Sequence, residues 1–224
     1  MPGSKSRNPN LLYEKQMLQQ GYGCILGMDE VGRGAWAGPV AVGAVALPLD
    51  APKLIQVLRG VRDSKQMTPR QRENVVNTIQ ETALAWGIGS AENQEIDRLG
   101  INLATRMAMQ RALDDARLRF PGFEPDCLFL DSMLWPEVAQ QIPQVSIVHG
   151  DNLSLSIAAA SVIAKVWRDA LMCDLDTELP RYSFGVHKGY GTQLHQVALK
   201  TYGPSPLHRT SYAPIRQLLE KDDV

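Results

Sequence analysis

The sequence feature that most constrains the fold is a set of three short apolar runs, each of which stops at acidic residues. The run 25–28 leads into Asp29 and Glu30, the run 128–130 ends at Asp131, and the run 146–148 is followed shortly by Asp151. In open α/β sheets the functional crevice lies at the carboxyl ends of the strands. If these runs are parallel, adjacent strands, four carboxylates converge at one edge of a sheet.

Four clustered carboxylates restrict the chemistry of that edge. In a cleft of reduced dielectric they repel one another strongly, so a cation has to hold them together. Ligation by oxygen alone favours Mg²⁺ or Mn²⁺ over zinc, and such ions support phosphoryl chemistry. The alternative is that each acid is a turn residue after its strand. The spacing therefore supports a metal site but does not name a substrate.

The composition places these strands in a globular protein. The chain has 224 residues, of which 44% are hydrophobic and 21% charged, and these values exclude a disordered, collagen-like or coiled-coil chain. The net charge is −1, so any binding of polyanions has to come from local patches.

Membrane insertion and secretion are not expected. The longest apolar stretch, residues 40–49, contains a Gly and a Pro and is shorter than the roughly 20 residues that span a bilayer. The N-terminus lacks the apolar core of a secretory signal. Cys24, Cys127 and Cys173 have no metal-binding spacing, which favours reduced thiols in a cytoplasmic protein.

The order of the expected elements predicts an α/β fold with a mixed sheet flanked by helices. Thr68 and Gln71 have the spacing of a capping box, so a helix is expected to begin after Thr68. The expected strands cover 24–28, 40–47, 84–88, 125–131 and 145–151. The other expected helices cover 11–20, 51–60, 93–99, 102–119, 153–177, 192–201 and 211–221, and residues 180–191 are expected to form a polar loop.

No linker divides the chain. Residues 1–10 are expected to be a flexible tail, and residues 11–224 a single catalytic domain, of which about 178–224 is a helical C-terminal extension.

Glycine-rich and basic segments supply further candidate residues. The turn 32–38 reads G-x-G-x-x-x-G, which is not the dinucleotide fingerprint, and its glycines either supply positive φ or bring backbone close to a ligand. Segments 63–65, 187–190 and 208–209 could contact phosphates, or could be solvated surface and packing anchors. Three serines stand near the start of the expected helix 153–177: Ser154, Ser156 and Ser161. They either favour the binding of an anion there or serve only as helix-start residues.

Taken together, these segments resemble the ribonuclease HII family, the type 2 ribonucleases H. The opening motif of that family is matched by DEVGRGAWAGP, from Asp29 to Pro39. Later matches follow in the family's order over residues 22–219: DSK at 63–65, GD at 150–151, SIAAAS at 156–161, AKV at 164–166, HKGY at 187–190 and HR at 208–209.

The resemblance implies a ribonuclease H-like fold with a five-stranded mixed sheet of order 3-2-1-4-5. It implies a metal-dependent endonuclease that hydrolyses the RNA strand of RNA–DNA hybrids and cuts at single ribonucleotides embedded in duplex DNA. The products would carry a 5′-phosphate and a 3′-hydroxyl. Such an enzyme would use Mg²⁺ or Mn²⁺, serve DNA replication and repair, and is expected to act as a monomer.

Site residues are carried over from the same resemblance. Asp29, Glu30, Asp131 and Asp151 would be the catalytic metal ligands. Gly32, Arg33 and Gly34 would contact the ribose 2′-OH, and Tyr190 the following deoxyribose. The remaining expected substrate contacts are Ser64, Lys65, Ser156, Lys165, Lys188 and Arg209.

Two positions depart from the family pattern. Ser132 stands where the family usually has Gly after the third acid, and this change is expected to affect loop geometry. His149 stands where the family usually has Lys, two residues before the fourth acid, so the charge there becomes dependent on pH.

Three alternatives stay open at the level of the sequence. A non-catalytic nucleic-acid-binding module would have no use for four clustered acids. Another Mg²⁺-dependent phosphohydrolase or nuclease of the same fold would need the acids but not Tyr190 or the turn 32–34. The sister type 3 ribonuclease H family shares the acids but lacks the junction tyrosine and this G-R-G form.

Overall fold

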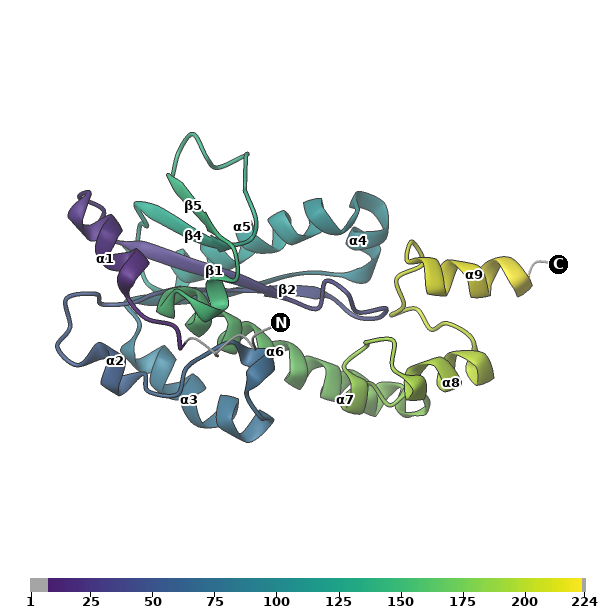
Figure 1. The fold of residues 1–224 in the computed structure, drawn as a ribbon. Coiled ribbons are helices and arrows are strands. Elements are labelled where there is room, and N and C mark those ends of the chain that lie inside the picture. Colours follow the sequence, from purple (N-terminus) through teal and green to yellow (C-terminus); the bar gives the residue numbers. More distant parts are fainter. Residues whose placement is uncertain (1–7, 223–224) are drawn as a thin grey trace, which may run out of the picture.

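A computed structural model of the protein describes residues 8–222. Its centre is a five-stranded sheet of order β3-β2-β1-β4-β5, as the resemblance implied (Figure 1). Strand β1 pairs antiparallel with β2 and parallel with β4, while β2–β3 is antiparallel and β4–β5 parallel. The strands are β1 (Ile25–Val31), β2 (Val40–Ala46), β3 (Ala85–Ala91), β4 (Cys127–Asp131) and β5 (Gln144–Ile147).

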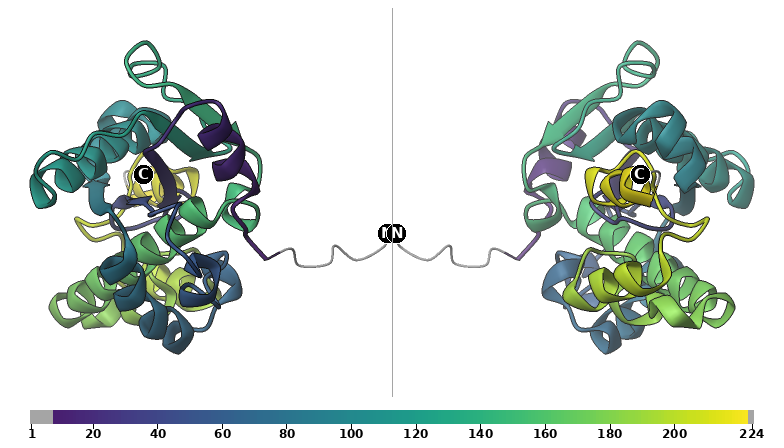
Figure 2. Two further views of the ribbon diagram at one scale, coloured as in Figure 1. Left: turned by 90° about the vertical axis from the view of Figure 1, so that its left-hand side faces the viewer. Right: turned by 90° about the vertical axis from the view of Figure 1, so that its right-hand side faces the viewer.

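Helices cover both faces of this sheet, and several gather beyond one end of it (Figures 1 and 2). The α-helices are α1 (Leu12–Gln19), α2 (Leu54–Val57), α3 (Pro69–Thr82), α4 (Asn93–Leu99), α5 (Ile101–Arg119), α6 (Leu155–Glu178), α7 (Phe184–His187), α8 (Gln193–Tyr202) and α9 (Ala213–Asp222). Short 3-10 turns are η1 (Ser64–Gln66), η2 (Gly150–Asn152) and η3 (Pro180–Tyr182).

Helices α5 and α6 lie on opposite faces of the sheet, and small residues in the strands let each helix approach closely. Gly27 of β1 has no room for a side chain, since a Cβ there would lie 2.4 Å from the carbonyl carbon of Ser156. Gly89 of β3 has the same relation to Ala108 of α5, whose carbonyl oxygen would lie 2.1 Å from the added Cβ. Glycines in the strands therefore set how near the two helices come to the sheet.

Several expected boundaries are confirmed and others are wrong. Helix α3 begins with the expected capping box, because the Thr68 hydroxyl accepts from Gln71 N–H at 3.3 Å and the Gln71 side chain accepts from Thr68 N–H at 2.9 Å. The expected strand 145–151 already ends at Ile147, and η2 follows. Strand β1 continues past Met28 to Val31, because β2 still pairs with it there.

The two ends of the chain also differ from the expectation. Of the expected tail 1–10, Asn10 is held in place, since its N–H donates to the Leu153 carbonyl at 3.2 Å and its own carbonyl accepts from Leu155 N–H at 3.0 Å. Residues 1–7 lie outside the described residues. The expected polar loop 180–191 contains η3 and α7. Within residues 8–222, no helix has the length and apolar composition needed to cross a bilayer.

Replacing Gly27 with Ala is expected to lower the free energy of unfolding by about 1–3 kcal/mol, because the added methyl group forces α6 away from the sheet. Chemical denaturation measures this loss. Gly23→Ala is the control, since its Cβ would meet only the Asp126 carboxylate, at the ordinary contact distance of 3.9 Å. Equal stabilities of the two variants would contradict the proposed packing constraint.

Candidate active site

Acidic residues gather where β1, β4 and the segment after β5 lie side by side. Met28 pairs with Leu130, so the next residues, Asp29 within β1 and Asp131 at the end of β4, lie on neighbouring parallel strands. Asp151 lies in η2, just after β5. Asp29 and Asp151 are buried, with exposures of 2% and 4%. The structure therefore brings three separate chain segments with acidic residues to one edge of the sheet.

These carboxylates disfavour one another's ionisation. Burial raises the pKa of Asp29 well above its ordinary value, and the charges of Glu30 and Asp131 raise it further. Burial also raises the pKa of Asp151, with added repulsion from Asp63 and Asp131. Such a cluster holds more negative charge than its surroundings neutralise.

Lys65 supplies part of the missing positive charge. Its Nζ lies 3.6 Å from Asp151 Oδ2. Partial burial lowers the pKa of Lys65, but the nearby carboxylates, Asp29 and Asp151 first, outweigh that effect and raise it. Lys65 is therefore held in its charged form beside the acidic edge.

The donor set suits a hard divalent cation. It consists of carboxylate oxygens, the ligands that Mg²⁺ and Mn²⁺ prefer. The buried Oε2 of Glu30 has no hydrogen-bond partner, as expected of an oxygen that is kept for a cation. Among residues 8–222, no three His, Cys, Asp or Glu side chains form a preformed metal cage. The structure thus offers suitable donors without a completed coordination shell.

The corner between β4 and η2 shows how the two sequence departures are accommodated. Asp131 Oδ1 accepts from Gly150 N–H at 2.8 Å and from the Ser132 hydroxyl at 3.1 Å. Ser132 and His149 both adopt left-handed backbone conformations, with φ of 52° and 57°. A glycine would adopt that conformation at Ser132 without steric cost. Ser132 keeps the turn and adds a hydrogen bond to the carboxylate.

The glycine-rich turn is held from behind by Arg168, whose side chain is fully buried. Its guanidinium donates to the carbonyls of Pro39, Ala37 and Lys188 at 2.8, 3.2 and 2.9 Å. A Cβ at Gly32, where φ is 90°, would lie 2.2 Å from Arg168 Nε. The first glycine of the turn is therefore required both for its backbone conformation and for the space that Arg168 occupies.

A cleft of about 580 Å³ opens beside Glu30. Tyr190 lines it and lies under two cations, with Lys165 Nζ 6.0 Å and Arg168 Cζ 5.7 Å from the ring centre. Lys165 also donates to Asp169 at 2.7 Å. The cleft collects many of the residues expected in the site: Glu30, Gly32, Arg33, Gly34, Ser64, Lys65, Lys165 and Tyr190.

Three expected substrate contacts do not line this cleft. Ser156 is fully buried, and its N–H donates to Glu14 Oε1 at 3.1 Å. Lys188 Nζ points to a separate cleft and donates to Cys173 Sγ and to the Gly185 carbonyl, both at 2.7 Å.

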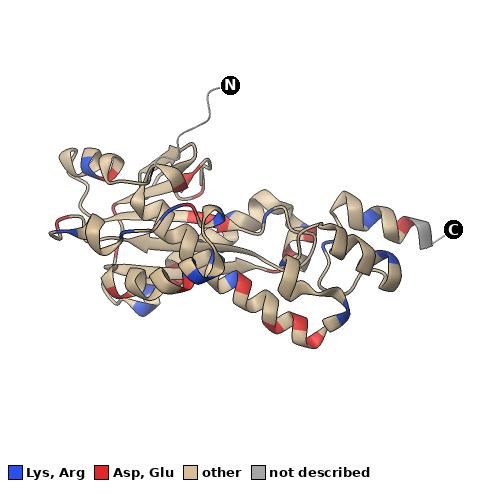
Figure 3. Ribbon diagram, turned by 60° about the horizontal axis from the view of Figure 1, so that its bottom comes forward, with Lys and Arg blue, Asp and Glu red and all other residues tan. Residues whose placement is uncertain are grey.

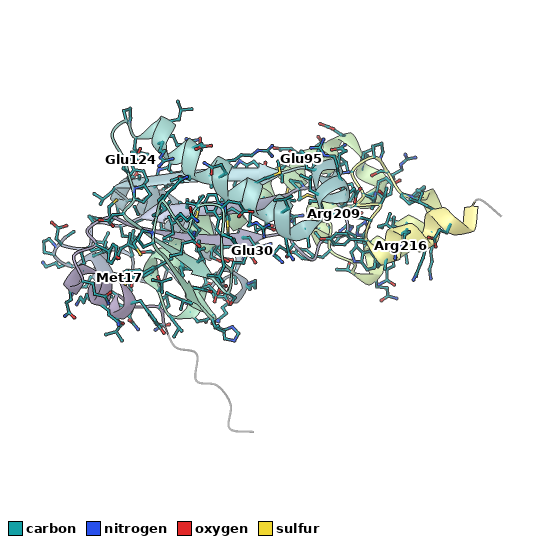
Figure 4. The ribbon with its side chains drawn as sticks, turned by 90° about the horizontal axis from the view of Figure 1, so that it is seen from above. Met17, Glu30, Glu95, Glu124, Arg209 and Arg216 are labelled. Atoms are coloured by element: carbon teal, nitrogen blue, oxygen red, sulfur yellow. The ribbon has the colours of Figure 1, made fainter. Side chains whose placement is uncertain are left out.

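Arg209 is the third of these residues. Its side chain is fully buried, and its guanidinium donates to the carbonyl of Gly38 at 2.9 and 3.0 Å and to that of Arg33 at 2.9 Å. In Figure 4, Arg209 lies between Glu30 and the C-terminal helix that carries Arg216. Arg209 thus fastens the segment before α9 to the glycine-rich turn.

Sequence reasoning missed that two arginines brace the site by donating to backbone carbonyls, although Arg72 was part of an expected basic patch that could hold phosphates. Arg72 lines the cleft and donates to the Ser64 and Met67 carbonyls at 2.9 and 2.6 Å, so it braces the DSK segment. The spacing of Arg168, four residues after the buried Ala164, was the available signal, because it places a charge on the buried row of α6.

Figure 3 shows that the two signs of charge are interspersed over the face it presents.

Comparison with known proteins agrees with this fold and site. The model of a family described as ribonuclease HII matches residues 26–215. The ribonuclease HII of Synechococcus sp. (strain JA-3-3Ab) is 48% identical over 210 residues, covering 94% of this chain and 90% of that protein.

Solved structures show the same fold. The ribonuclease H2 of Pyrococcus horikoshii OT3 matches with a TM-score of 0.65 and 25% identity, covering 88% of this chain and 98% of the other. The structure of Bst-RNase HIII in complex with Mn²⁺ matches with a TM-score of 0.71, covering 99% of this chain and 76% of the other, and at 18% identity this likeness concerns the fold alone.

The mixed sheet and its flanking helices thus define a protein of the ribonuclease H-like class. Within that class, the chain belongs to the ribonuclease HII family. The family model and the curated relatives favour this type over the sister type 3 family, which the sequence had left as an alternative.

Asp29→Asn is expected to stabilise the protein in the presence of a chelator, increasingly so as the pH rises above the ordinary Asp value of 3.8. Above the ordinary value the folded protein holds a proton on Asp29 that the unfolded chain has already released, so the parent loses stability as the pH rises toward the raised pKa, and the loss levels off above it. Thermal melts from pH 4 to 8 measure the difference, and a variant with the same pH slope as the parent would contradict the assignment.

Ser132→Gly is expected to raise the free energy of unfolding by up to about 1 kcal/mol, because it removes left-handed strain at a non-glycine residue. The lost hydrogen bond to Asp131 and the greater freedom of the unfolded chain reduce the gain. Ser132→Ala is the matched control, since it loses the hydroxyl and keeps the strain, and it should be less stable than both the glycine variant and the parent. If the alanine variant were as stable as the glycine variant, strain at this corner would be excluded.

Proposed function

We propose that the protein is an endonuclease that hydrolyses the RNA strand of RNA–DNA hybrids and cuts at single ribonucleotides embedded in duplex DNA. Membership of the ribonuclease HII family supports the reaction class. The observation that carries the finer proposal is the single cleft shared by Glu30 of the acidic edge, the turn Gly32–Gly34 and Tyr190. Cleavage at a single ribonucleotide requires a surface that recognises the sugar, placed next to the carboxylates that support phosphoryl chemistry.

In this proposal Asp29, Glu30, Asp131 and Asp151 hold Mg²⁺ or Mn²⁺. Bound there, the ions would supply the Lewis-acid chemistry that activates a water and stabilises the leaving 3′ oxygen. The partnerless Oε2 of Glu30 and the mutual repulsion of the carboxylates support this role. Hydrolysis in this sense leaves a 5′-phosphate and a 3′-hydroxyl.

The basic residues of the cleft receive the phosphates. Lys65, Lys165 and Arg72 line it, and Arg72 and Lys165 share Asp169 at 3.2 and 2.7 Å. Sharing a carboxylate fixes both side chains at one wall of the cleft. Because the whole chain carries a net charge of −1, duplex affinity depends on these few cations and should fall steeply with salt.

Recognition of the sugar falls to the turn and to Tyr190. The turn presents backbone close to the cleft because Arg168 holds the carbonyls of Ala37 and Pro39, which follow the cleft-lining residues of the turn, and that of Lys188, which precedes Tyr190. A site built to hydrogen-bond a 2′-OH rejects the sugar that lacks it, since its own polar groups would otherwise stay unpaired. The Tyr190 ring offers a flat apolar surface to the deoxyribose that follows.

Incubation with a duplex that contains one ribonucleotide tests the proposal directly. Cleavage on the 5′ side of that ribonucleotide, dependent on Mg²⁺ or Mn²⁺ and leaving 5′-phosphate and 3′-hydroxyl ends, is the expected result. Asp29→Asn should abolish it, whereas Asp50→Asn, a change at an exposed residue outside the site, should not. Chelator-resistant cleavage, or no cleavage of this duplex and of a uniform hybrid, would refute the proposal.

Tyr190→Ala is expected to lower cleavage at a single embedded ribonucleotide by roughly 5- to 150-fold, the equivalent of a stacking contact worth about 1–3 kcal/mol. The loss on a long RNA–DNA hybrid should be smaller, because most of its cuts lack a junction. Tyr190→Phe keeps the ring and should stay near the parent on both duplexes. If Tyr190 is only a packing anchor, the alanine variant loses both activities equally and melts at a lower temperature.

A further inference from the structure

Three buried histidines lie behind the loop that carries Tyr190. His187 ends α7, His195 is in the first turn of α8, and His208 precedes Arg209, so three segments of the C-terminal extension supply one cluster. The rings of His187 and His195 stack with centroids 4.2 Å apart, and the Nε2 atoms of His195 and His208 are 2.9 Å apart. Figure 1 shows α7 and α8 side by side beyond the sheet.

Backbone N–H groups fix where two of these rings carry their proton. Gly189 N–H points at His187 Nδ1 at 3.2 Å, so His187 accepts there and donates from Nε2 to the Tyr182 carbonyl at 2.7 Å. Ser205 N–H points at His208 Nδ1 at 2.8 Å, so His208 accepts there and carries its proton on Nε2.

The proton on His208 then decides the state of His195. His208 Nε2–H donates to His195 Nε2, which leaves the His195 proton on Nδ1, and Nδ1–H donates to the Tyr190 carbonyl at 3.0 Å. A further proton on any of the three rings would face an N–H group. Burial, followed for His195 by the neighbouring His187 ring, lowers the pKa of His195 to about 4, and burial lowers that of His208 to about 4. The three rings are therefore neutral at physiological pH.

The hydrogen bonds of the cluster end on the residues that place the Tyr190 ring. His187 holds the N–H of Gly189, whose carbonyl accepts from Trp36 N–H at 2.8 Å, and His195 holds the carbonyl of Tyr190. Since Trp36 belongs to the glycine-rich turn, the loop is joined to the turn just before Tyr190, and it is joined to α8 at the Tyr190 carbonyl.

We propose that His195 is a positioning residue, which orients Tyr190 by donating a hydrogen bond to its carbonyl while His208 fixes the direction of that bond. The proposal rests on the proposed function, in which Tyr190 contacts the deoxyribose that follows the ribonucleotide. His195 itself is fully buried and touches no substrate. Its effect is expected on recognition of the junction and not on the chemical step of every cut.

Two variants at this position separate positioning from packing. His195→Phe fills the ring space without a donor, and His195→Asn places an amide N–H near the position of Nδ1 but leaves a cavity. Positioning predicts that His195→Phe loses about 3- to 10-fold in kcat/KM on the single-ribonucleotide duplex, as for one hydrogen bond, with a smaller loss on a uniform hybrid. His195→Asn should recover most of the loss even where it melts at a lower temperature than His195→Phe.

Ser205→Ala is the matched control inside the cluster. It removes a hydroxyl 2.9 Å from His208 Nδ1 but leaves the Ser205 N–H that fixes the proton on Nε2. It should lower the melting temperature without a selective loss on the junction duplex. Phe and Asn variants with equal losses on both duplexes, in proportion to their melting temperatures, would overturn the proposal and leave His195 a packing residue.

Pairing with Tyr190→Ala separates failure of this inference from failure of the proposed function. If Tyr190→Ala shows the selective loss, His195→Phe should add little to it on the junction duplex, because both variants disable the same contact. Additive losses, or a selective loss for Tyr190→Ala with none for His195→Phe, would overturn the positioning role alone. No selective loss for Tyr190→Ala itself would overturn the role of Tyr190 and the inference with it.

Discussion

The close approach of α6 to the central strands is the constraint on which the site depends. Gly27 and Gly43 leave no room for a side chain against the backbone of α6, so the helix is fixed in height and register over β1 and β2. From that one helix come Ser161, which hydrogen-bonds Ser64 at 2.8 Å, and Lys165 and Arg168 further along. A small change in this packing would move the carboxylates at the sheet edge, the basic residues at the wall of the cleft and the glycine-rich turn relative to one another.

The fold stabilises an arrangement that its charges oppose. Asp29 and Asp151 are buried beside other carboxylates, and only part of that charge is offset by Lys65. On the other side of the cleft, the buried guanidiniums of Arg168 and Arg209 are satisfied by backbone carbonyls instead of by carboxylates. Their charge therefore adds, from behind the turn, to the positive potential of the cleft in which phosphates are expected to lie.

Much of the fold and part of the site could be predicted from the sequence. Local signals sufficed for the capping box at Thr68, and the motif resemblance sufficed for the strand order. The roles of Ser156, Lys188 and Arg209 could not be predicted, because a motif match gives a position but not which way its side chain faces. Burial decides that for both Arg209 and Ser156. The histidine cluster needs three segments to meet, which no local pattern encodes.

The contact between Lys188 and Cys173 has a practical consequence. Burial raises the pKa of both Cys24 and Cys127 to about 11, which keeps these two thiols protonated at neutral pH. Cys173 is the exposed one of the three cysteines and accepts from Lys188, two residues before Tyr190. A maleimide fluorophore should therefore attach to the unmodified chain predominantly at one place. Attached there, it would act as an optical reporter of how the Tyr190 loop responds when a duplex enters the cleft.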